Sequence, residues 1–93
     1  MTDLIDLSLL KESRSLLEML LQKRGLTFFL AKEGAQPLFS LEKSKVELVL
    51  RTASAKLARK GRAVHPKAAE YCRKEIRREL IKRLTEAMLR VGY

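Results

Sequence analysis

Apolar residues recur at spacings of three, four and seven in three separate stretches of this chain, and this periodicity limits the fold more than any other feature. Such spacing places apolar side chains along one side of an α-helix. The stripes are Leu9, Leu10, Leu16, Leu17, Leu20 and Leu21; then Val46, Val49, Leu50, Ala53 and Leu57; then Ala69, Cys72, Ile76, Leu80, Leu84, Ala87 and Val91. The sequence therefore predicts a mainly α fold, with amphipathic helices over residues 4–24, 41–60 and 66–91 of a single domain, 1–93.

Glycine, proline and serine mark the ends of these helices. Gly25 and Gly61 each follow a helical stretch, where glycine commonly terminates a helix. Pro66 occupies the first position of the third helix, where its missing N–H costs no hydrogen bond. Ser40 is suited to cap the start of the second helix. The boundaries of all three helices thus follow from local chemistry.

The segment between the first two helices, residues 26–39, has a different pattern. Residues 27–31 form a β-prone run, residues 32–36 form a polar turn, and residues 37–39 form a second short run. Gly34 supplies the positive φ that a tight turn requires. The sequence predicts one short β-hairpin here. Because two strands alone are marginal in water, the hairpin is expected to pack on the helices or pair with a second subunit.

The third helix is long for a chain of this size. At 1.5 Å per residue, a helix over residues 66–91 is about 39 Å long, whereas a compact domain of 93 residues has a radius of gyration near 12 Å. The end of this helix is therefore expected to extend beyond the core. An apolar stripe outside the core needs a partner, so the sequence predicts a homodimer or a larger assembly.

Charge is distributed unevenly along the chain. The net charge is +9, but residues 1–39 carry five basic and five acidic side chains, so residues 40–93 account for all of it. No acidic residue lies between Glu47 and Glu70. A basic stretch that nothing nearby neutralises favours binding to a polyanion, and nucleic acid is the most common one.

The predicted phosphate contacts lie on this basic half of the chain. They are Arg51, Lys56, Arg59, Lys60, Arg62, Lys67, Lys74, Arg78 and Lys82. The end of the second helix, the connector and the start of the third helix are expected to bring four of them, Arg59, Lys60, Arg62 and Lys67, to one edge of the fold. Three others recur every four residues along the third helix and point in one direction. Replacing Arg59, Lys60 and Arg62 together is expected to weaken binding with little loss of stability.

A plainer interpretation of the basic helix is that its charges only solvate an outer face. Glu70, Glu79 and Glu86 each lie four residues before a cation, namely Lys74, Arg83 and Arg90. Pairs at this spacing stabilise a helix by roughly 0.2–0.5 kcal/mol each. The acid-free stretch is harder to explain as solvation, so a polyanion contact remains the favoured interpretation there.

Weak sequence preference is expected of such a surface. Phosphate contacts position a protein without reading bases, and the chain contains no Asn for reading adenine. Phe28, Phe29 and Phe39 lie in the predicted hairpin and are expected to be core residues. Tyr71 is the one aromatic residue beside the basic helix. DNA binding and RNA binding both remain open.

Catalysis is not expected. The chain has one histidine, His65, one cysteine, Cys72, and no aspartate beyond Asp6, so neither a Ser-His-Asp nor a Cys-His arrangement is readily assembled. One cysteine permits no internal disulfide and no multi-cysteine zinc site. His65 is assigned a role at the helix start, with a phosphate contact as the alternative. We expect a non-enzymatic protein without cofactor or metal.

A second function class stays open beside nucleic-acid binding. A small adaptor or subunit of this composition would bind an acidic protein partner through its Leu-rich first helix and hairpin, with the basic half steering the encounter. The N-terminus has acidic residues where a secretory signal would have basic ones, so a cytoplasmic location, free or in a nucleoid or ribonucleoprotein, is expected. Low amide content with abundant Lys, Arg and Glu is typical of hyperthermophile proteins, although a GC-rich genome biases composition similarly.

Overall fold

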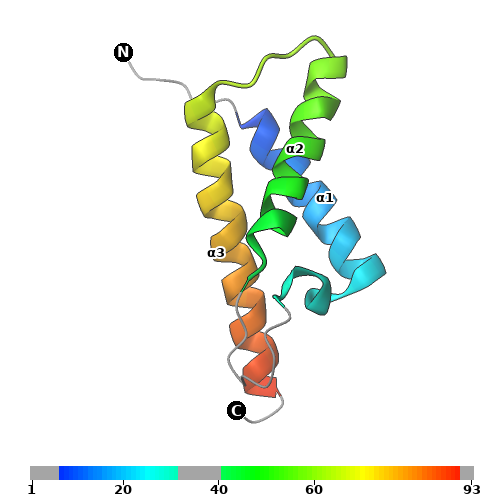
Figure 1. Ribbon diagram of the computed structural model, residues 1–93, viewed down its shortest axis with the longest axis vertical. Helices are drawn as coiled ribbons and strands as arrows, with labels where there is room; N and C mark the ends of the chain where they lie inside the picture. Colours follow the sequence, from blue (N-terminus) through cyan, green and yellow to red (C-terminus); the bar gives the residue numbers. More distant parts are fainter. Residues whose placement is uncertain (1–6, 32–40, 91–93) are drawn as a thin grey trace.

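The computed structural model of the chain is an elongated arrangement of three α-helices and describes residues 7–31 and 41–90. The elements are α1 (Ser8–Arg24), the short 3₁₀-helix η1 (Leu26–Phe29), α2 (Lys43–Arg59) and α3 (Pro66–Arg90). The molecule measures 46 × 28 × 21 Å, and α3 runs along most of its long axis (Figure 1). The predicted mainly α fold with three helices is confirmed. No helix within the described ranges combines the length and the apolar character that crossing a membrane requires.

The helix ends follow the predicted chemistry at three positions. Gly25 and Gly61 have φ values of 80° and 78°, a region that strongly favours glycine. The N–H of Gly25 donates to the carbonyl of Leu21 at 2.9 Å, which closes the end of α1. Pro66 is the first residue of α3, as predicted. Nδ1 of His65 accepts a hydrogen bond from the backbone N–H of the second helical residue at 3.0 Å, which confirms its role at the helix start.

The start of α2 differs from the prediction. The cap is Glu42, whose side chain accepts a hydrogen bond from the backbone N–H of Ser44 at 3.4 Å. The predicted cap, Ser40, lies outside the described residues. A carboxylate suits this position because it accepts the hydrogen bond and because its negative charge interacts favourably with the positive end of the helix dipole.

The predicted hairpin is not found in the described part of the chain. Its first arm was expected over residues 27–31, but Leu26–Phe29 form a 3₁₀ turn directly after α1. Hydrogen bonds of the i→i+3 type satisfy this backbone locally, and Phe29 is fully buried in the helical core. In the described part of the chain, the only strand-like feature of this region is a single antiparallel bridge between Leu30 and Leu41. The second arm, residues 37–39, lies outside the described residues.

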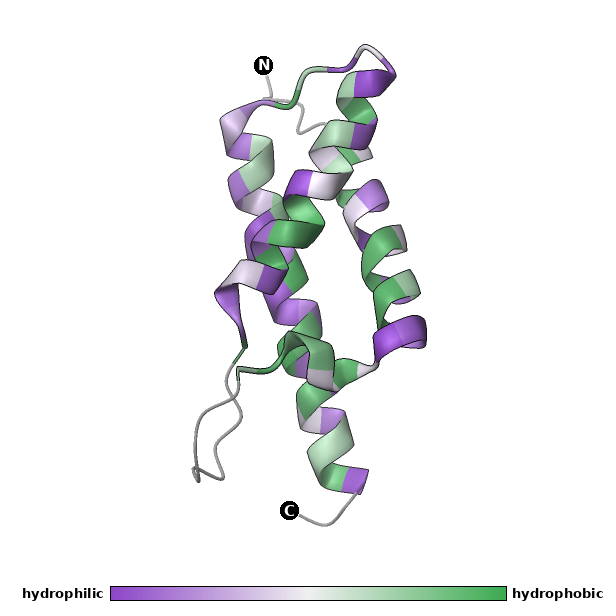
Figure 2. Cartoon of the chain, turned by 45° about the vertical axis from the view of Figure 1, so that its right-hand side comes forward, coloured by the Kyte–Doolittle hydropathy of each residue, from purple (hydrophilic) through white to green (hydrophobic). Residues whose placement is uncertain are grey.

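The core lies where the three helices meet. All five predicted residues of the α2 stripe are buried, and the leucines of α1 are buried or packed against the core. On α3 the buried residues are Ala68, Cys72, Ile76 and Leu80, while Ala69 is only partly buried. Figure 2 shows apolar residues concentrated on the helix faces that turn toward one another. The apolar periodicity thus predicted the packing faces of α1 and α2 and, on α3, the stretch from Cys72 to Leu80; the predicted stripe residues Leu84 and Ala87 are only partly buried, and Val91 lies outside the described residues.

The last ten residues of α3 extend beyond this core. Leu80 is the last fully buried residue of the helix, and none of residues 81–90 is buried. Figure 1 shows this end of α3, drawn in orange and red, projecting past α1 and α2. The predicted overhang of the third helix is therefore present.

One polar group in the core makes no hydrogen bond. Ser13 of α1 is completely buried, and its hydroxyl has no hydrogen-bond partner among residues 7–31 and 41–90. A buried polar group without a partner costs about 1–3 kcal/mol. Ser13 fits its position by size, since it is one of the smallest side chains in the core.

We predict that Ser13→Ala stabilises the protein, because the variant removes an unpartnered hydroxyl and keeps the volume. The matched control is Ser15→Ala, an exposed position on the same helix that gains only the higher helix propensity of alanine. In urea unfolding, Ser13→Ala is expected to exceed the control by about 1 kcal/mol in free energy of unfolding. A Ser13→Ala variant less stable than the wild type would contradict this assignment.

Candidate nucleic-acid interface

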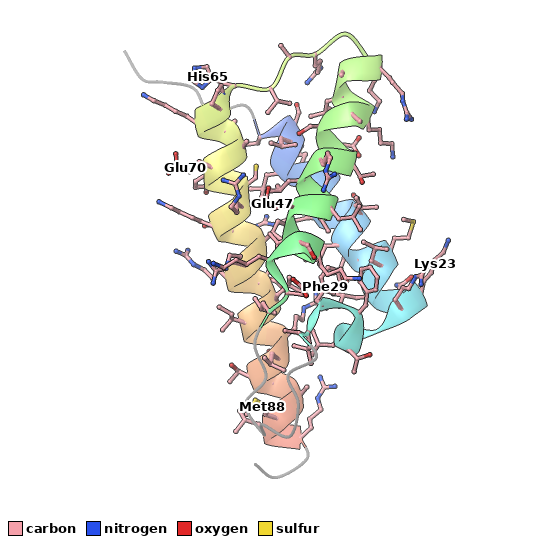
Figure 3. The ribbon with its side chains drawn as sticks, viewed as in Figure 1. Lys23, Phe29, Glu47, His65, Glu70 and Met88 are labelled. Carbon is pink, nitrogen blue, oxygen red and sulfur yellow. The ribbon has the colours of Figure 1, made fainter. Side chains whose placement is uncertain are left out.

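The predicted phosphate contacts are all exposed, but the structure divides them between two surfaces. Arg51, Lys56 and Arg59 belong to α2, Lys60 directly follows its end, and Lys67, Lys74, Arg78 and Lys82 belong to α3. Arg62 lies in the connector between the two helices, which crosses one end of the molecule (Figure 1). Basic side chains project outward from α3 and, separately, from the upper end of α2 (Figure 3).

The surface at the end of α2 is partly neutralised by α1. The Glu12 carboxylate lies 3.6 Å from Nζ of Lys56 and 3.3 Å from Nζ of Lys60. The hydrogen bond from Lys60 is the main reason that the pKa of Glu12 falls below its ordinary value, and the charge of Lys56 adds to it. The stretch that lacks acids in the sequence therefore does not lack them in space. The expectation that nothing neutralises it was wrong for these two lysines.

The remaining members of the predicted quartet are less engaged. Nη1 of Arg62 donates a hydrogen bond to the hydroxyl of Ser8 at 2.5 Å, so this cation keeps its charge but is tied to α1. Of this quartet, Lys60 and Arg62 already contact Glu12 and Ser8, whereas Arg59 and Lys67 take part in no ion pair among the described residues.

The outer face of α3 presents a more continuous basic row. Lys67, Lys74, Arg78 and Lys82 lie on the side of the helix opposite the buried residues of its core stripe. At 1.5 Å per residue, the row from Lys67 to Lys82 spans about 22 Å. Tyr71, whose exposed fraction is 37%, lies within the same row.

Arg77 belongs to this surface although the sequence analysis did not select it. It is exposed, and together with Lys74, Arg78 and Ile81 it lines a shallow hollow of about 310 Å³. Arg77 does not fit the four-residue spacing of Lys74, Arg78 and Lys82, because it lies about 100° around the helix from Arg78. Its position directly beside Arg78 in the sequence was the available signal.

Two of the four acids of α3, Glu75 and Glu79, are partly buried beside the core, whereas Glu70 and Glu86 are exposed. Glu75 pairs with Arg14 of α1 at 3.8 Å and with Arg78 at 3.2 Å. Glu79 accepts from Arg83 at 2.8 Å, and Arg83 also pairs with Glu18 of α1. Of the outer row, these acids neutralise only Arg78, through Glu75, and their other partners are Arg14 and Arg83.

Two of the three predicted i,i+4 pairs are therefore not formed. Of Glu70–Lys74, Glu79–Arg83 and Glu86–Arg90, the structure contains only Glu79–Arg83. Within the described ranges, Lys67, Lys74, Arg77 and Lys82 take part in no ion pair. The outer face of α3 thus carries the least neutralised charge on the helix.

A bidentate ion pair connects α2 to α3 beside this surface. Nε and Nη2 of Arg73 lie 2.5 and 3.2 Å from the two carboxylate oxygens of Glu47. The hydrogen bond from Arg73 is the main cause that lowers the pKa of Glu47, and Arg51, one turn further along α2, contributes through its charge. Arg51 therefore acts mainly as a supporting charge for the Glu47–Arg73 pair, and it contributes less to the outer row of α3.

The aromatic residues divide between the core and the surface. Phe29 is buried, as predicted, and its ring meets that of Phe28 edge to face at 5.1 Å. Phe28 is only half-buried, and Nζ of Lys45 lies 4.0 Å from its ring centroid, with the guanidinium of Arg24 at 5.5 Å. Both cations make cation–π interactions with the Phe28 ring. This aromatic site is built from α1, η1 and α2 and is separate from the row on α3.

Neither the metal-ligating residues, nor Cys72, nor comparison with known proteins indicates a second site in the described part of the chain. In the described part of the chain, no three His, Cys, Asp or Glu side chains form a group that could hold a metal ion. Cys72 is buried, and burial raises the pKa of its thiol. Comparison with known proteins finds no matching family model, no matching curated protein and no matching solved structure. The function must therefore be argued from the geometry of this chain.

The Glu47–Arg73 pair makes a testable contribution to stability. Because the pKa of Glu47 is lower in the folded state, its contribution is present above the unfolded pKa and is lost as the pH falls through the folded pKa. Glu47→Gln is expected to destabilise the protein at pH 7 by no more than about 1 kcal/mol, since the pair is half exposed to solvent. Urea unfolding between pH 7 and pH 3 is expected to show the difference disappearing at the acidic end. A difference independent of pH would contradict the assignment.

Proposed function

We propose that this chain is a small, non-enzymatic nucleic-acid-binding protein that contacts phosphates through the outer face of α3. The observation that carries the proposal is the separation of charge on that helix. Its acids Glu75 and Glu79 pair with Arg14, Arg78 and Arg83, whereas the outer cations Lys67, Lys74, Arg77 and Lys82 take part in no ion pair among the described residues. The binding residues are Lys67, Lys74, Arg77, Arg78 and Lys82.

The shape of the surface supports contact with a phosphate backbone. Cations four residues apart rise about 6 Å along a helix, so a row of them faces an extended polyanion without bending. Such contacts position the protein on DNA or RNA and carry little sequence information. The class of function proposed is architectural or regulatory DNA binding, or a structural role in an RNA–protein assembly.

The end of α2 and the connector extend this surface with weaker contacts. Arg59 is free to bind, whereas Lys56 and Lys60 must leave Glu12 or bind phosphate while remaining beside it. Nη1 of Arg62 is already engaged with Ser8, so a phosphate is bound by its other N–H groups within the position that this hydrogen bond sets. We therefore rank Arg59 above these three residues and Arg51 below the outer row of α3. Replacing Arg59, Lys60 and Arg62 together is expected to cost less affinity than neutralising α3.

The decisive variant is Lys74→Ala/Arg77→Ala/Lys82→Ala, which removes three cations without ion pairs among the described residues. Affinity for duplex DNA and for matched RNA is measured by fluorescence anisotropy from low to high salt. Each lost phosphate contact lowers the log–log salt slope by about 0.9 on duplex DNA, so the slope is expected to fall by about 2 to 3.

The matched control is Lys11→Ala/Lys23→Ala/Lys43→Ala, which removes the same charge from exposed positions on α1 and α2. It is expected to lower affinity less and to leave the salt slope nearly unchanged. Equal losses in the two triple variants would mean that net charge alone drives binding. Wild-type affinity no tighter than about 10⁻⁴ M at physiological salt would be ordinary nonspecific binding and would contradict the proposal.

We further propose that two copies of the chain associate through the projecting end of α3. Leu89 and Ile81 have exposed fractions of 69% and 48%, unusually high for large apolar side chains. The same segment carries both Glu86 and Arg90, so an antiparallel pair of identical helices can match opposite charges. The predicted homodimer thus has a specific candidate interface.

Sedimentation velocity tests this association. The wild type is expected to sediment as a dimer, and Ile81→Glu/Leu89→Glu as a folded monomer, because a carboxylate at each position opposes burial of the interface. Leu7→Glu is the control, since Leu7 is 50% exposed at the start of α1, far along the chain from this segment. A wild-type protein that remains monomeric across the accessible concentration range would remove the interface.

A further inference from the structure

A groove between α1 and α2 is distinct from the basic face of α3. It has a volume of about 330 Å³ and is lined by Glu12, Ser15, Leu16 and Met19 of α1 and by Thr52, Ala53 and Lys56 of α2. The α1 residues recur at spacings of three, four and seven, and the α2 residues at spacings of one, three and four. The groove therefore follows the seam between the two helices.

The floor of the groove is apolar and partly open. Met19, which lines the groove, has an exposed fraction of 42%. Leu48 is not one of the lining residues but lies one helical turn before Thr52 on α2, with an exposed fraction of 38%. Exposed large apolar side chains along a helical seam indicate an interaction surface when they lie together. A seam of this kind is the geometry in which one amphipathic helix lies against two others.

The rim at one end of the groove has excess positive charge. Two ammonium groups, those of Lys56 and Lys60, share the single carboxylate of Glu12. Arg59, on the same end of α2, takes part in no ion pair among the described residues. An incoming carboxylate can therefore be bound here without displacing Glu12, since each lysine has further N–H donors.

The combination of floor and rim selects the occupant. A nucleic acid has no apolar stripe to cover Leu16 and Met19, so the floor is unsuited to it. A second copy of this chain is also unsuited, because each of its three helices carries more basic than acidic side chains. A helix with an apolar stripe and acidic flanks satisfies both parts of the groove.

We propose that the α1–α2 groove binds an acidic amphipathic helix of a partner protein, with apolar side chains on Leu16, Met19 and Leu48 and a carboxylate at Lys56 and Lys60. This site is separate from the primary nucleic-acid surface, because the outer row of α3 faces away from α1 and α2; only Lys56 and Lys60 are shared with the weaker contacts at the end of α2. It gives the adaptor function a defined surface, made by α1 with α2. The protein is then able to bind a polyanion and an acidic helix at the same time.

A synthetic peptide pair tests the groove without a known partner. One peptide is helical, with leucines at spacings of three and four and glutamates elsewhere; the other has the same composition with the leucines permuted so that no stripe forms. Fluorescence anisotropy gives the affinity ratio of the two, which cancels the general attraction of an acidic peptide for a basic protein. The striped peptide is expected to bind about tenfold tighter or more, since a few apolar anchors dominate such interfaces.

Paired variants locate the site. Met19→Glu/Leu48→Glu is expected to abolish the affinity ratio, whereas Leu7→Glu/Tyr71→Glu, with the same charge change at exposed positions outside the groove, is expected to keep it. Amide shift mapping is expected to place the striped peptide on residues 12–19 and 48–56. Circular dichroism is used to check that both variants are folded.

Three outcomes would overturn the proposal. They are equal affinity for the two peptides, a ratio that survives in Met19→Glu/Leu48→Glu, and wild-type self-association that this variant abolishes, which would assign the groove to a second copy. The α3 variant Lys74→Ala/Arg77→Ala/Lys82→Ala is expected to retain the ratio while losing nucleic-acid affinity. Failure of the groove and failure of the nucleic-acid face are therefore observed in separate measurements.

Discussion

The burial of Cys72, Ile76 and Leu80 against α1 and α2 sets the orientation of α3, and the other features of the molecule depend on that orientation. These three side chains are completely buried and lie one helical turn apart. Once they face inward, the helix has no rotational freedom, and the residues between them must face outward. The basic row of α3 is thus a consequence of how its apolar residues pack.

Ion pairs then distribute the remaining charge. Arg73 and Arg83 lie at the border of the core and bind Glu47 of α2 and Glu18 of α1. Pairs of this kind at a protein surface contribute about 0–1 kcal/mol each, so they do little to hold the fold together. Their larger effect is on the electrostatic field, because they hold acids close to the core, while Lys67, Lys74, Arg77 and Lys82 of α3 take part in no ion pair among the described residues.

The structure separates two surfaces that the basic C-terminal half of the sequence combines. The outer face of α3 presents a row of exposed cations, as expected of a surface for phosphates. The groove between α1 and α2 has an apolar floor and a basic rim, formed where Glu12 meets Lys56 and Lys60. One excess of positive charge thereby supports two proposed ligands of different chemistry. This arrangement reconciles the nucleic-acid and adaptor hypotheses, which the sequence presents as rivals.

The sequence by itself determined the helices, their buried faces and most of their ends, because apolar period, glycine at positive φ and proline at a first turn are local properties. It also determined that the net charge lies after residue 39. Only the tertiary structure decided that Leu26–Phe29 close a 3₁₀ turn, because burying Phe29 among helices outweighs β propensity. Only the tertiary structure, likewise, placed Glu12 against lysines more than forty residues away. Which charges remain unpaired depends on distances between helices, and no single stretch of sequence contains those distances.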